Sequence, residues 1–178
     1  MSLVLGLDSS TQSLSAVILD TEKGIVVASH SVNFGSNLAH YNQPHGYDET
    51  GARGEIHSNP LMWLEALDLL LAQLVSENID LSQIKAVSGS GQQHGSIYLR
   101  ANFNETLNGL TAQSDLKTQL ANCLSRLSSP IWMDSSTSEE CAEIAHAVGD
   151  NKIVCSKSGS VAVERFTGPQ IRKFAKTD

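Results

Sequence analysis

The sequence lacks any apolar run long enough to span a membrane, and its N-terminus lacks the cationic patch followed by an apolar stretch that marks a signal peptide. Basic residues are also scarce: 12 lysines and arginines stand against 19 acidic residues, which gives a formal net charge of −7 over 178 residues without a basic cluster. This balance argues against a surface that binds nucleic acid or an anionic membrane. We therefore expect a cytoplasmic chain whose partners include neither nucleic acid nor a membrane.

Cysteine is scarce as well. Cys123, Cys141 and Cys155 form no CxxC pair and no metal-ligand spacing. Their odd number is typical of reduced thiols in the cytosol, so we expect them to fill the core.

The shortage of lysine and arginine also means that, if a polyanion such as ATP binds, backbone dipoles and a metal ion must neutralise its charge. With 40% hydrophobic residues, the chain can bury a core and is expected to form one domain.

The first half of the chain predicts an antiparallel meander followed by a helix. Apolar runs at 3–8, 14–20 and 25–33 are separated by turn residues and read as three strands. Residues 34–57 lose all periodicity and are expected to form a long functional loop. Asn59 and Pro60 then predict the start of a helix that ends near Glu77. Its expected apolar stripe is Leu64, Leu67, Leu71, Leu74 and Val75.

The second half alternates short strands and helices. Strands are predicted at 84–87, 96–99 and 130–133, with a weakly amphipathic helix within 101–129 that carries Leu116, Leu120, Cys123, Leu124 and Leu127. Thr137 to Glu140 form a capping box for a helix that Gly149 stops, and a final helical pattern carries Ile171, Phe174 and Ala175. The pattern predicts an α/β fold, a mixed sheet flanked by helices.

Polar residues follow three of the predicted strands. Asp8, the glycine loop around His94, and Asp134 each come after an apolar run. Because ligands in open α/β sheets bind outside the carboxyl ends of strands, we expect these three places to converge on one crevice.

The hairpin tip at residues 8–13 combines a carboxylate, hydroxyls, an amide and backbone N–H groups. Donors of this kind hold phosphate oxygens, while Asp8 would hold the Mg²⁺ that bridges them. The alternative stays open that Asp, Ser and Thr in a tight turn only bond their own backbone.

The glycine loop at 88–95 matches neither of two familiar patterns. His94 stands where a dinucleotide fingerprint requires glycine, and Ser88 stands where a nucleophile elbow requires glycine before Ser90. What remains is a flexible backbone that presents Gln92, Gln93 and His94, whose side chains donate and accept hydrogen bonds as a sugar requires.

Four segments resemble the FGGY family of carbohydrate kinases, within the actin/hexokinase superfamily. Residues 8–13 (DSSTQS) resemble its phosphate-binding hairpin, although many members have glycine where this chain has Ser10. Residues 88–98 resemble the substrate loop of the xylulose kinase branch. Residues 131–137 resemble a segment that reads Trp-Asn-Asp-Gly in bacterial members, here in the form typical of animal and related xylulose kinases. Residues 164–169 resemble the family's Phe-Thr segment with its preceding arginine.

The resemblance implies an actin/hexokinase-like (ribonuclease H-like) domain, with residues 1–178 as the leading part of the N-terminal kinase domain. It implies a kinase that closes on ATP and a ketopentose and passes the γ-phosphoryl group to D-xylulose, giving D-xylulose 5-phosphate. On the nucleotide side, Asp8 would organise Mg²⁺ and the phosphates, with Thr11 and Gln12 beside it.

On the sugar side, the resemblance implies that His94 and Arg165 hydrogen-bond the ketose, with Gln93 close by. Asp134 would support the sugar side, or it caps the next helix. Likewise, His94 could serve only to tie down its own loop, and Arg165 could be an ordinary surface charge.

The family's general base is an aspartate in a downstream Gly-Asp motif, and nothing after Arg165 matches it. We therefore expect the base downstream of Asp178, and a truncated chain that is inactive alone and lacks the C-terminal ATP-binding domain, the missing part of the kinase. The alternatives are a non-catalytic sugar-binding or interaction module, a kinase for another ketose or polyol such as ribulose, and a phosphatase or ATPase of the same superfamily. The oligomeric state, a homodimer included, stays open.

Overall fold

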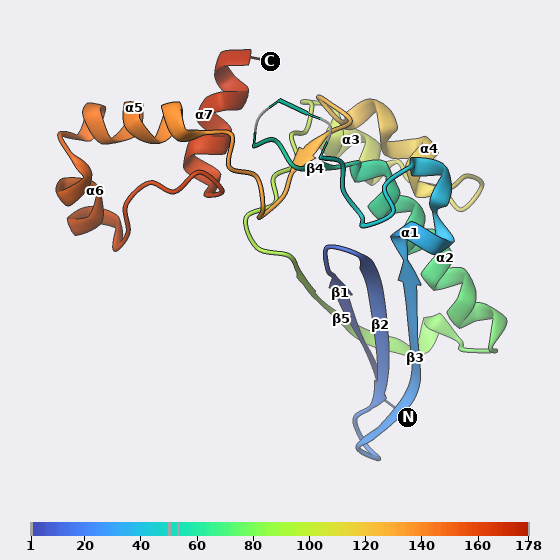
Figure 1. The fold of residues 1–178 in the computed structure, drawn as a ribbon. Coiled ribbons are helices and arrows are strands. Elements are labelled where there is room, and N and C mark those ends of the chain that lie inside the picture. The colour runs from blue at the N-terminus through green and yellow to red at the C-terminus, as the bar shows by residue number, and fades with distance from the viewer. Residues whose placement is uncertain (1, 50, 53, 178) are drawn as a thin grey trace. The chain divides into compact units, whose positions relative to one another are not determined.

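The computed structural model describes residues 2–49, 51–52 and 54–177, and Figure 1 shows its fold. The chain divides into two compact units, which are described separately. The first comprises Met1–Tyr47, Asn59–Gln92 and Tyr98–Leu127, and the second comprises Asp48–Ser58, Gln93–Ile97 and Ser128–Asp178.

The first unit contains a four-stranded sheet in the order β3-β2-β1-β5. Strands β1 (Leu3–Ser9), β2 (Ser13–Asp20) and β3 (Ile25–Asn33) pair antiparallel, which confirms the predicted meander. Alternate residues of β2 are buried, as expected for a strand with one face on the core. The buried carboxylate of Asp20 accepts hydrogen bonds from the backbone N–H groups of Glu22 and Lys23, which closes the turn into β3.

Strand β5 (Ile84–Gly91) is longer than predicted and lies parallel to β1. The prediction that the strand ends at Val87 was wrong, because Ser88 to Gly91 continue the pairing as far as Ser9. Seven of its eight residues are exposed, so the small side chains of Ser and Gly remove few packing contacts from this edge strand.

Helix α2 (Pro60–Ser76) covers the sheet, and its predicted bounds are confirmed. The Asn59 side chain caps it by accepting from the N–H of Leu61. The predicted stripe is confirmed in part: Leu74 is buried, Leu67 and Leu71 are partly buried and pack against the core, and Val75 is exposed. The fully buried face is the i, i+4 row of Met62, Ala66, Leu70 and Leu74.

Short helices replace several predicted elements of the first unit. The expected loop 34–57 begins with α1 (Phe34–Asn37) and a 3₁₀ turn (Ala39–Tyr41), and its residues 50 and 53 lie outside the described part. The single helix expected within 101–129 is instead α3 (Phe103–Asn108), α4 (Leu116–Leu120) and a 3₁₀ turn (Ala121–Cys123). Leu124 leaves the helical conformation and forms an isolated β-bridge with Leu99. The strand expected at 96–99 is therefore reduced to this single bridge.

The second unit pairs β4 (His57–Ser58) with β6 (Ser129–Pro130) and carries α5 (Ser138–Val148), α6 (Asn151–Ser158) and α7 (Thr167–Thr177). The strand expected at 130–133 ends at Pro130, because the chain turns there and the N–H of Asp134 donates to the carbonyl of Ile131. Helix α5 begins and ends as predicted, but the capping box is absent: the Thr137 hydroxyl donates to the carbonyl of Glu164.

The three cysteines are free thiols. Only Cys123 is buried, since Cys141 is half-buried and Cys155 is exposed, so the expectation that all three fill the core was wrong for two of them.

Candidate functional site

Asp8 lies near the end of β1, beside the parallel strand β5. The backbone register pairs it with Ser90, and the N–H of Gln92 donates to the carbonyl of Ser9 at 2.9 Å. The carboxyl ends of β1 and β5 therefore meet, as the sequence predicted for Asp8 and the beginning of the glycine loop. An open hollow of about 310 Å³ lies here, lined by residues of β1, β2 and β5 that include Asp8 and Ser90.

Two hydroxyls hold the Asp8 carboxylate. Ser10 donates to Oδ2 from the hairpin tip, and Ser90 donates to Oδ1 from β5. These two hydrogen bonds lower the pKa of Asp8, so the group stays ionised at neutral pH. The tip itself is closed by a hydrogen bond from the N–H of Ser10 to the carbonyl of Ser13.

The donor set at this tip fits magnesium bound through a nucleotide. Among the described residues, no group of three or more His, Cys, Asp or Glu could hold a metal ion by itself. Mg²⁺ does not need such a cage, because it commonly takes one or two protein carboxylates, waters and the substrate's phosphates. An ionised Asp8 beside hydroxyls matches that mode.

A loop packs closely on the hairpin tip. Gly46 has φ +82°, and a Cβ built on it would lie 2.0 Å from the carbonyl oxygen of Thr11. No side chain is tolerated at that distance, so glycine is required for residues 43–47 to reach the tip. Thr11 is thereby fixed from one side, whereas the neighbouring Gln12 is exposed.

In the second unit, His94 and Arg165 meet at one aromatic ring. The imidazole of His94 stacks on the ring of Phe166, with centroids 4.9 Å apart and planes inclined by 30°. The guanidinium carbon of Arg165 lies 6.0 Å from the same centroid. The structure thus brings together two residues that the sequence assigned to the sugar. Gln93, which directly precedes His94 in the chain, is exposed.

Asp134 is buried, and both of its oxygens are engaged. Oδ1 accepts from the N–H and hydroxyl of Ser136 and from the Gln170 amide. Oδ2 accepts from the N–H of Ile56 and lies 3.1 Å from Nε2 of His57. Burial alone would raise the pKa of this carboxyl, but the hydrogen bonds, that from His57 foremost, hold it well below its usual range.

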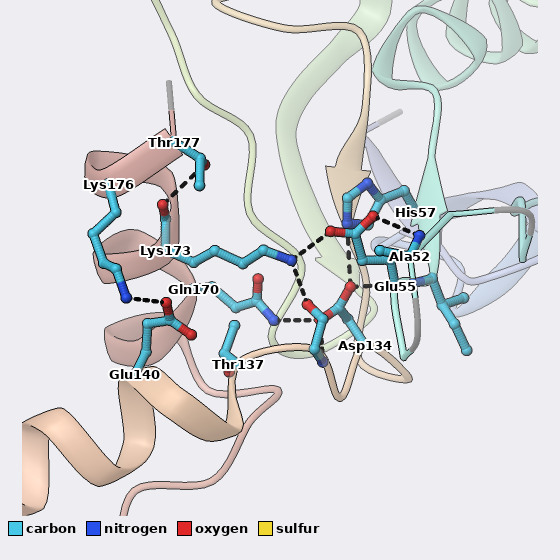
Figure 2. Close-up of polar contacts among 12 residues, drawn as sticks. Ala52, Glu55, His57, Asp134, Thr137, Glu140, Gln170, Lys173, Lys176 and Thr177 are labelled. Atoms are coloured by element: carbon cyan, nitrogen blue, oxygen red, sulfur yellow. Dashed lines mark hydrogen bonds and ion pairs between the residues drawn. The ribbon is translucent and has the colours of Figure 1, made fainter.

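Gln170 connects this buried carboxylate to the Arg165 segment. Its Nε2 donates to Oδ1 of Asp134 at 2.8 Å (Figure 2). The same nitrogen donates to the carbonyl of Glu164 at 3.1 Å, and the Thr137 hydroxyl donates to that carbonyl as well. The residue before Arg165 is therefore held by two donors. A hollow of about 290 Å³ lies along this segment; its lining includes Trp132, Asp134, Glu164 and Arg165.

Lys173 adds further polar contacts near Asp134. Lys173 on α7 donates to Oε1 of Glu55 and, at 2.8 Å, to the hydroxyl of Ser136 (Figure 2). Sequence reasoning missed His57, Gln170 and Lys173, as well as any role for Phe166. Only Phe166 carried a signal, because it directly follows Arg165 in a segment already singled out.

The predicted site residues fall into two groups. Asp8, Thr11 and Gln12 belong to the first unit, and Gln93, His94, Asp134 and Arg165 belong to the second. The first group is the one expected to hold phosphates, and the second is the one expected to hold a sugar. A single crevice shared by both groups stays a prediction.

The model of the FGGY family of carbohydrate kinases, N-terminal domain, matches residues 3–176. The chain belongs to this family. It is 49% identical over 177 residues to xylulose kinase 2 of Arabidopsis thaliana, covering 99% of this chain and 32% of that protein. It is 40% identical over 170 residues to the xylulose kinase of Mus musculus, covering 96% of this chain and 31% of that protein. The FGGY chain thus spans about a third of the length of these relatives.

Solved structures share the fold at low sequence identity. A xylulose kinase from Rhodospirillum rubrum matches 99% of the chain and 29% of its own, with a TM-score of 0.65 and 18% identity. Plasmodium falciparum glycerol kinase with ADP matches the whole chain and 29% of its own, with a TM-score of 0.63 and 17% identity. These likenesses confirm the predicted α/β, actin/hexokinase-like fold class. No helix among the described residues of this FGGY chain is long and apolar enough to cross a membrane.

Proposed function

We propose that the chain is the N-terminal, sugar-binding part of a kinase that phosphorylates D-xylulose to D-xylulose 5-phosphate with ATP. The observation that carries the proposal is the meeting of His94 and Arg165 at one aromatic ring. An imidazole both donates and accepts, and a guanidinium donates in a fixed fork, which suits a ligand rich in hydroxyls. The relatives suggest the ketose, since xylulose kinases of a plant and an animal align with nearly the whole chain.

The nucleotide side of this kinase is assigned to the hairpin tip. Asp8 is kept ionised by Ser10 and Ser90, which suits it to a cation shared with phosphates. Asp8 would hold Mg²⁺ here, and the ion would supply the positive charge that neutralises the phosphates of ATP. Thr11 and Gln12 would donate to those oxygens, and the scarcity of lysine and arginine in the chain makes such neutral donors necessary.

The proton acceptor of the reaction is assigned outside this chain. Phosphoryl transfer needs positioning, charge stabilisation and one carboxylate that takes the hydroxyl proton. Asp134 is saturated by its own hydrogen bonds, and Asp8 is committed to the nucleotide side. We therefore infer that the general base belongs to a further part of the protein, as the greater length of the relatives allows.

Strand β5 supports contact with such a part. Seven of the eight residues of β5 are exposed, and the apolar side chain of Val87 is 62% exposed. A further segment that packs on this strand would bury that apolar side chain.

Titration of the purified chain tests the proposal. We expect D-xylulose to bind, with no ATP-dependent formation of D-xylulose 5-phosphate. An absence of binding to any ketose or polyol would contradict the sugar-binding role. Tighter binding of D-ribulose than of D-xylulose would indicate a kinase for another ketose. Turnover by the chain alone would overturn the assignment of the base to another part, and ATP hydrolysis that is independent of sugar would favour an ATPase.

A further inference from the structure

We propose that Phe166 is a positioning residue that holds His94 and Arg165 in the arrangement that binds the ketose. This inference rests on the proposed function and deepens it, because it names the residue that aligns the two sugar-binding side chains.

The stacking contact is the first support. The rings of His94 and Phe166 lie nearly face to face, at 4.9 Å and 30°, which is a favourable separation for aromatic pairs. Both side chains are half-buried, so the imidazole has one face on Phe166 while part of it stays accessible. The stack limits rotation of the imidazole and thereby sets the direction of its two nitrogens.

The backbone of His94 is the second support. Its φ is +62°, in the left-handed region that residues with a Cβ rarely adopt. Such a conformation persists only where surrounding contacts over-determine it, and the stack on Phe166 is one of these contacts. Without the ring, residue 94 would be freer to return to an extended conformation and carry its imidazole elsewhere.

Arg165 is the third support. Its guanidinium lies at the outer limit of a cation–π contact with the Phe166 ring, 6.0 Å from the centroid, and the side chain is exposed. An exposed arginine samples many rotamers, and ordering it on ligand binding costs affinity. Contact with the ring reduces that cost by restricting the guanidinium before the sugar arrives.

The backbone around Phe166 is rigid enough to serve as this support. Its N–H donates to the carbonyl of Val163 at 2.8 Å, and its carbonyl accepts from the N–H of Gln170 at 3.2 Å. One residue earlier than Arg165, the carbonyl of Glu164 is held by Thr137 and by the Gln170 amide. Hydrogen bonds therefore hold the backbone both before and after Phe166, and Gln170, which makes one of them, also donates to the buried Asp134.

The test compares three variants of the chain. Phe166→Leu removes the ring and keeps an apolar side chain, Phe166→Tyr keeps the ring, and Phe174→Leu removes a half-buried phenylalanine of α7. Circular dichroism checks the fold of each variant. If Phe166→Leu does not fold, Phe166→Met takes its place, because its longer flexible side chain fills more of the space left by the ring.

Two readouts follow. The ring protons of His94, observed by NMR, should show the upfield ring-current shift of a stacked imidazole in the wild type and in Phe166→Tyr, and lose it in Phe166→Leu. The Kd for D-xylulose, from calorimetric titration, should rise about 3- to 10-fold in Phe166→Leu and stay near the wild-type value in Phe166→Tyr and Phe174→Leu.

Each outcome decides between the two proposals. If the wild type binds D-xylulose and Phe166→Leu binds equally well, the positioning role is overturned and the proposed function stands. If Phe166→Tyr weakens binding as much as Phe166→Leu although its stack is intact, the role assigned to the ring is also overturned. If the wild type binds no ketose, the proposed function fails and this inference fails with it, whatever the NMR shift shows.

Discussion

The side-chain amide of Gln170 donates to Oδ1 of Asp134 at 2.8 Å, and both side chains are buried. The same amide holds the carbonyl that precedes Arg165. A buried carboxylate is costly unless it is fully hydrogen-bonded, and here the donors come from Ile56, His57, Ser136 and Gln170. The contact therefore couples the stability of the second unit to the placement of Arg165.

Removal of the Asp134 carboxylate should destabilise the second unit strongly. In Asp134→Ala, the N–H of Ile56 loses its side-chain acceptor, and the amide of Gln170 loses one of its two acceptors. We expect a loss on the order of 3 kcal/mol in the free energy of unfolding, measured by urea denaturation. Asp134→Asn keeps one carbonyl oxygen and should lose less. Equal stability of Asp134→Ala and wild type would contradict a structural role.

The same carboxylate should make stability depend on pH. Its pKa is held below the usual range in the folded chain, so the unfolded chain takes up a proton first as the pH falls. The contribution of Asp134 is therefore fully present above a pH of about 4 and declines below it, through the folded-state pKa. Several other carboxyls also have lowered pKa values, so the informative quantity is the difference between wild type and Asp134→Asn. That difference should shrink on acidification, and a constant difference from pH 7 to pH 3 would count against the linkage.

Loss of the His94 imidazole should affect the sugar and spare the nucleotide. If it bonds a ketose hydroxyl, His94→Ala in the complete kinase leaves that hydroxyl unpaired and weakens D-xylulose binding by about 1–3 kcal/mol. Binding of Mg·ATP should change little. His146→Ala, in which an exposed histidine of α5 is replaced, is the matched control. Equal losses for both ligands in His94→Ala would indicate a disturbed fold.

Asp8→Asn should have the opposite selectivity. The change removes the negative charge, and the amide nitrogen that replaces one oxygen cannot accept from Ser10 or Ser90. We expect the affinity for Mg·ATP to fall about 10- to 100-fold, as for other residues that support a bound metal, with D-xylulose binding unchanged. Calorimetric titration of both ligands into the full-length kinase measures this, because the ATP-binding domain is expected outside this chain; Glu105→Gln on the exposed face of α3 is the control. Unchanged nucleotide binding would remove Asp8 from the proposed phosphate site.

Strong local patterns predicted the elements that depend on few long-range contacts. The meander followed from three apolar runs separated by turns, and α2 followed from the cap at Asn59. The extension of β5 through Gly91 was missed because Ser and Gly are poor strand formers, and it is pairing with β1 that holds them extended. The strand expected at 130–133 failed for a similar reason, since a turn at Asp134 overrides the apolar run.

The candidate site was predictable only in part. His94 and Arg165 could be singled out by resemblance, but their shared contact with Phe166 joins positions more than 70 residues apart in the sequence, which no local pattern reports. The hydrogen bonds of Asp134 to Ile56 and Gln170 are equally non-local. The sequence therefore left Asp134 either supporting the sugar side or capping the next helix, because its burial and its hydrogen-bond partners are features of the folded chain alone.

Gly46 provides the sharpest test of the loop that packs on the hairpin tip. Gly46→Ala places a Cβ 2.0 Å from the Thr11 carbonyl at a φ of +82°, so the loop must move or the tip must distort. We expect a loss of about 3 kcal/mol or more in the free energy of unfolding, together with weaker Mg·ATP binding. Gly24→Ala is the matched control: its φ is +66° but nothing lies within 4 Å of the new Cβ, so only the conformational cost of about 1–2 kcal/mol applies. Urea denaturation of both variants separates the steric part from the conformational part, and equal losses would mean that residues 43–47 do not press on Thr11 in solution.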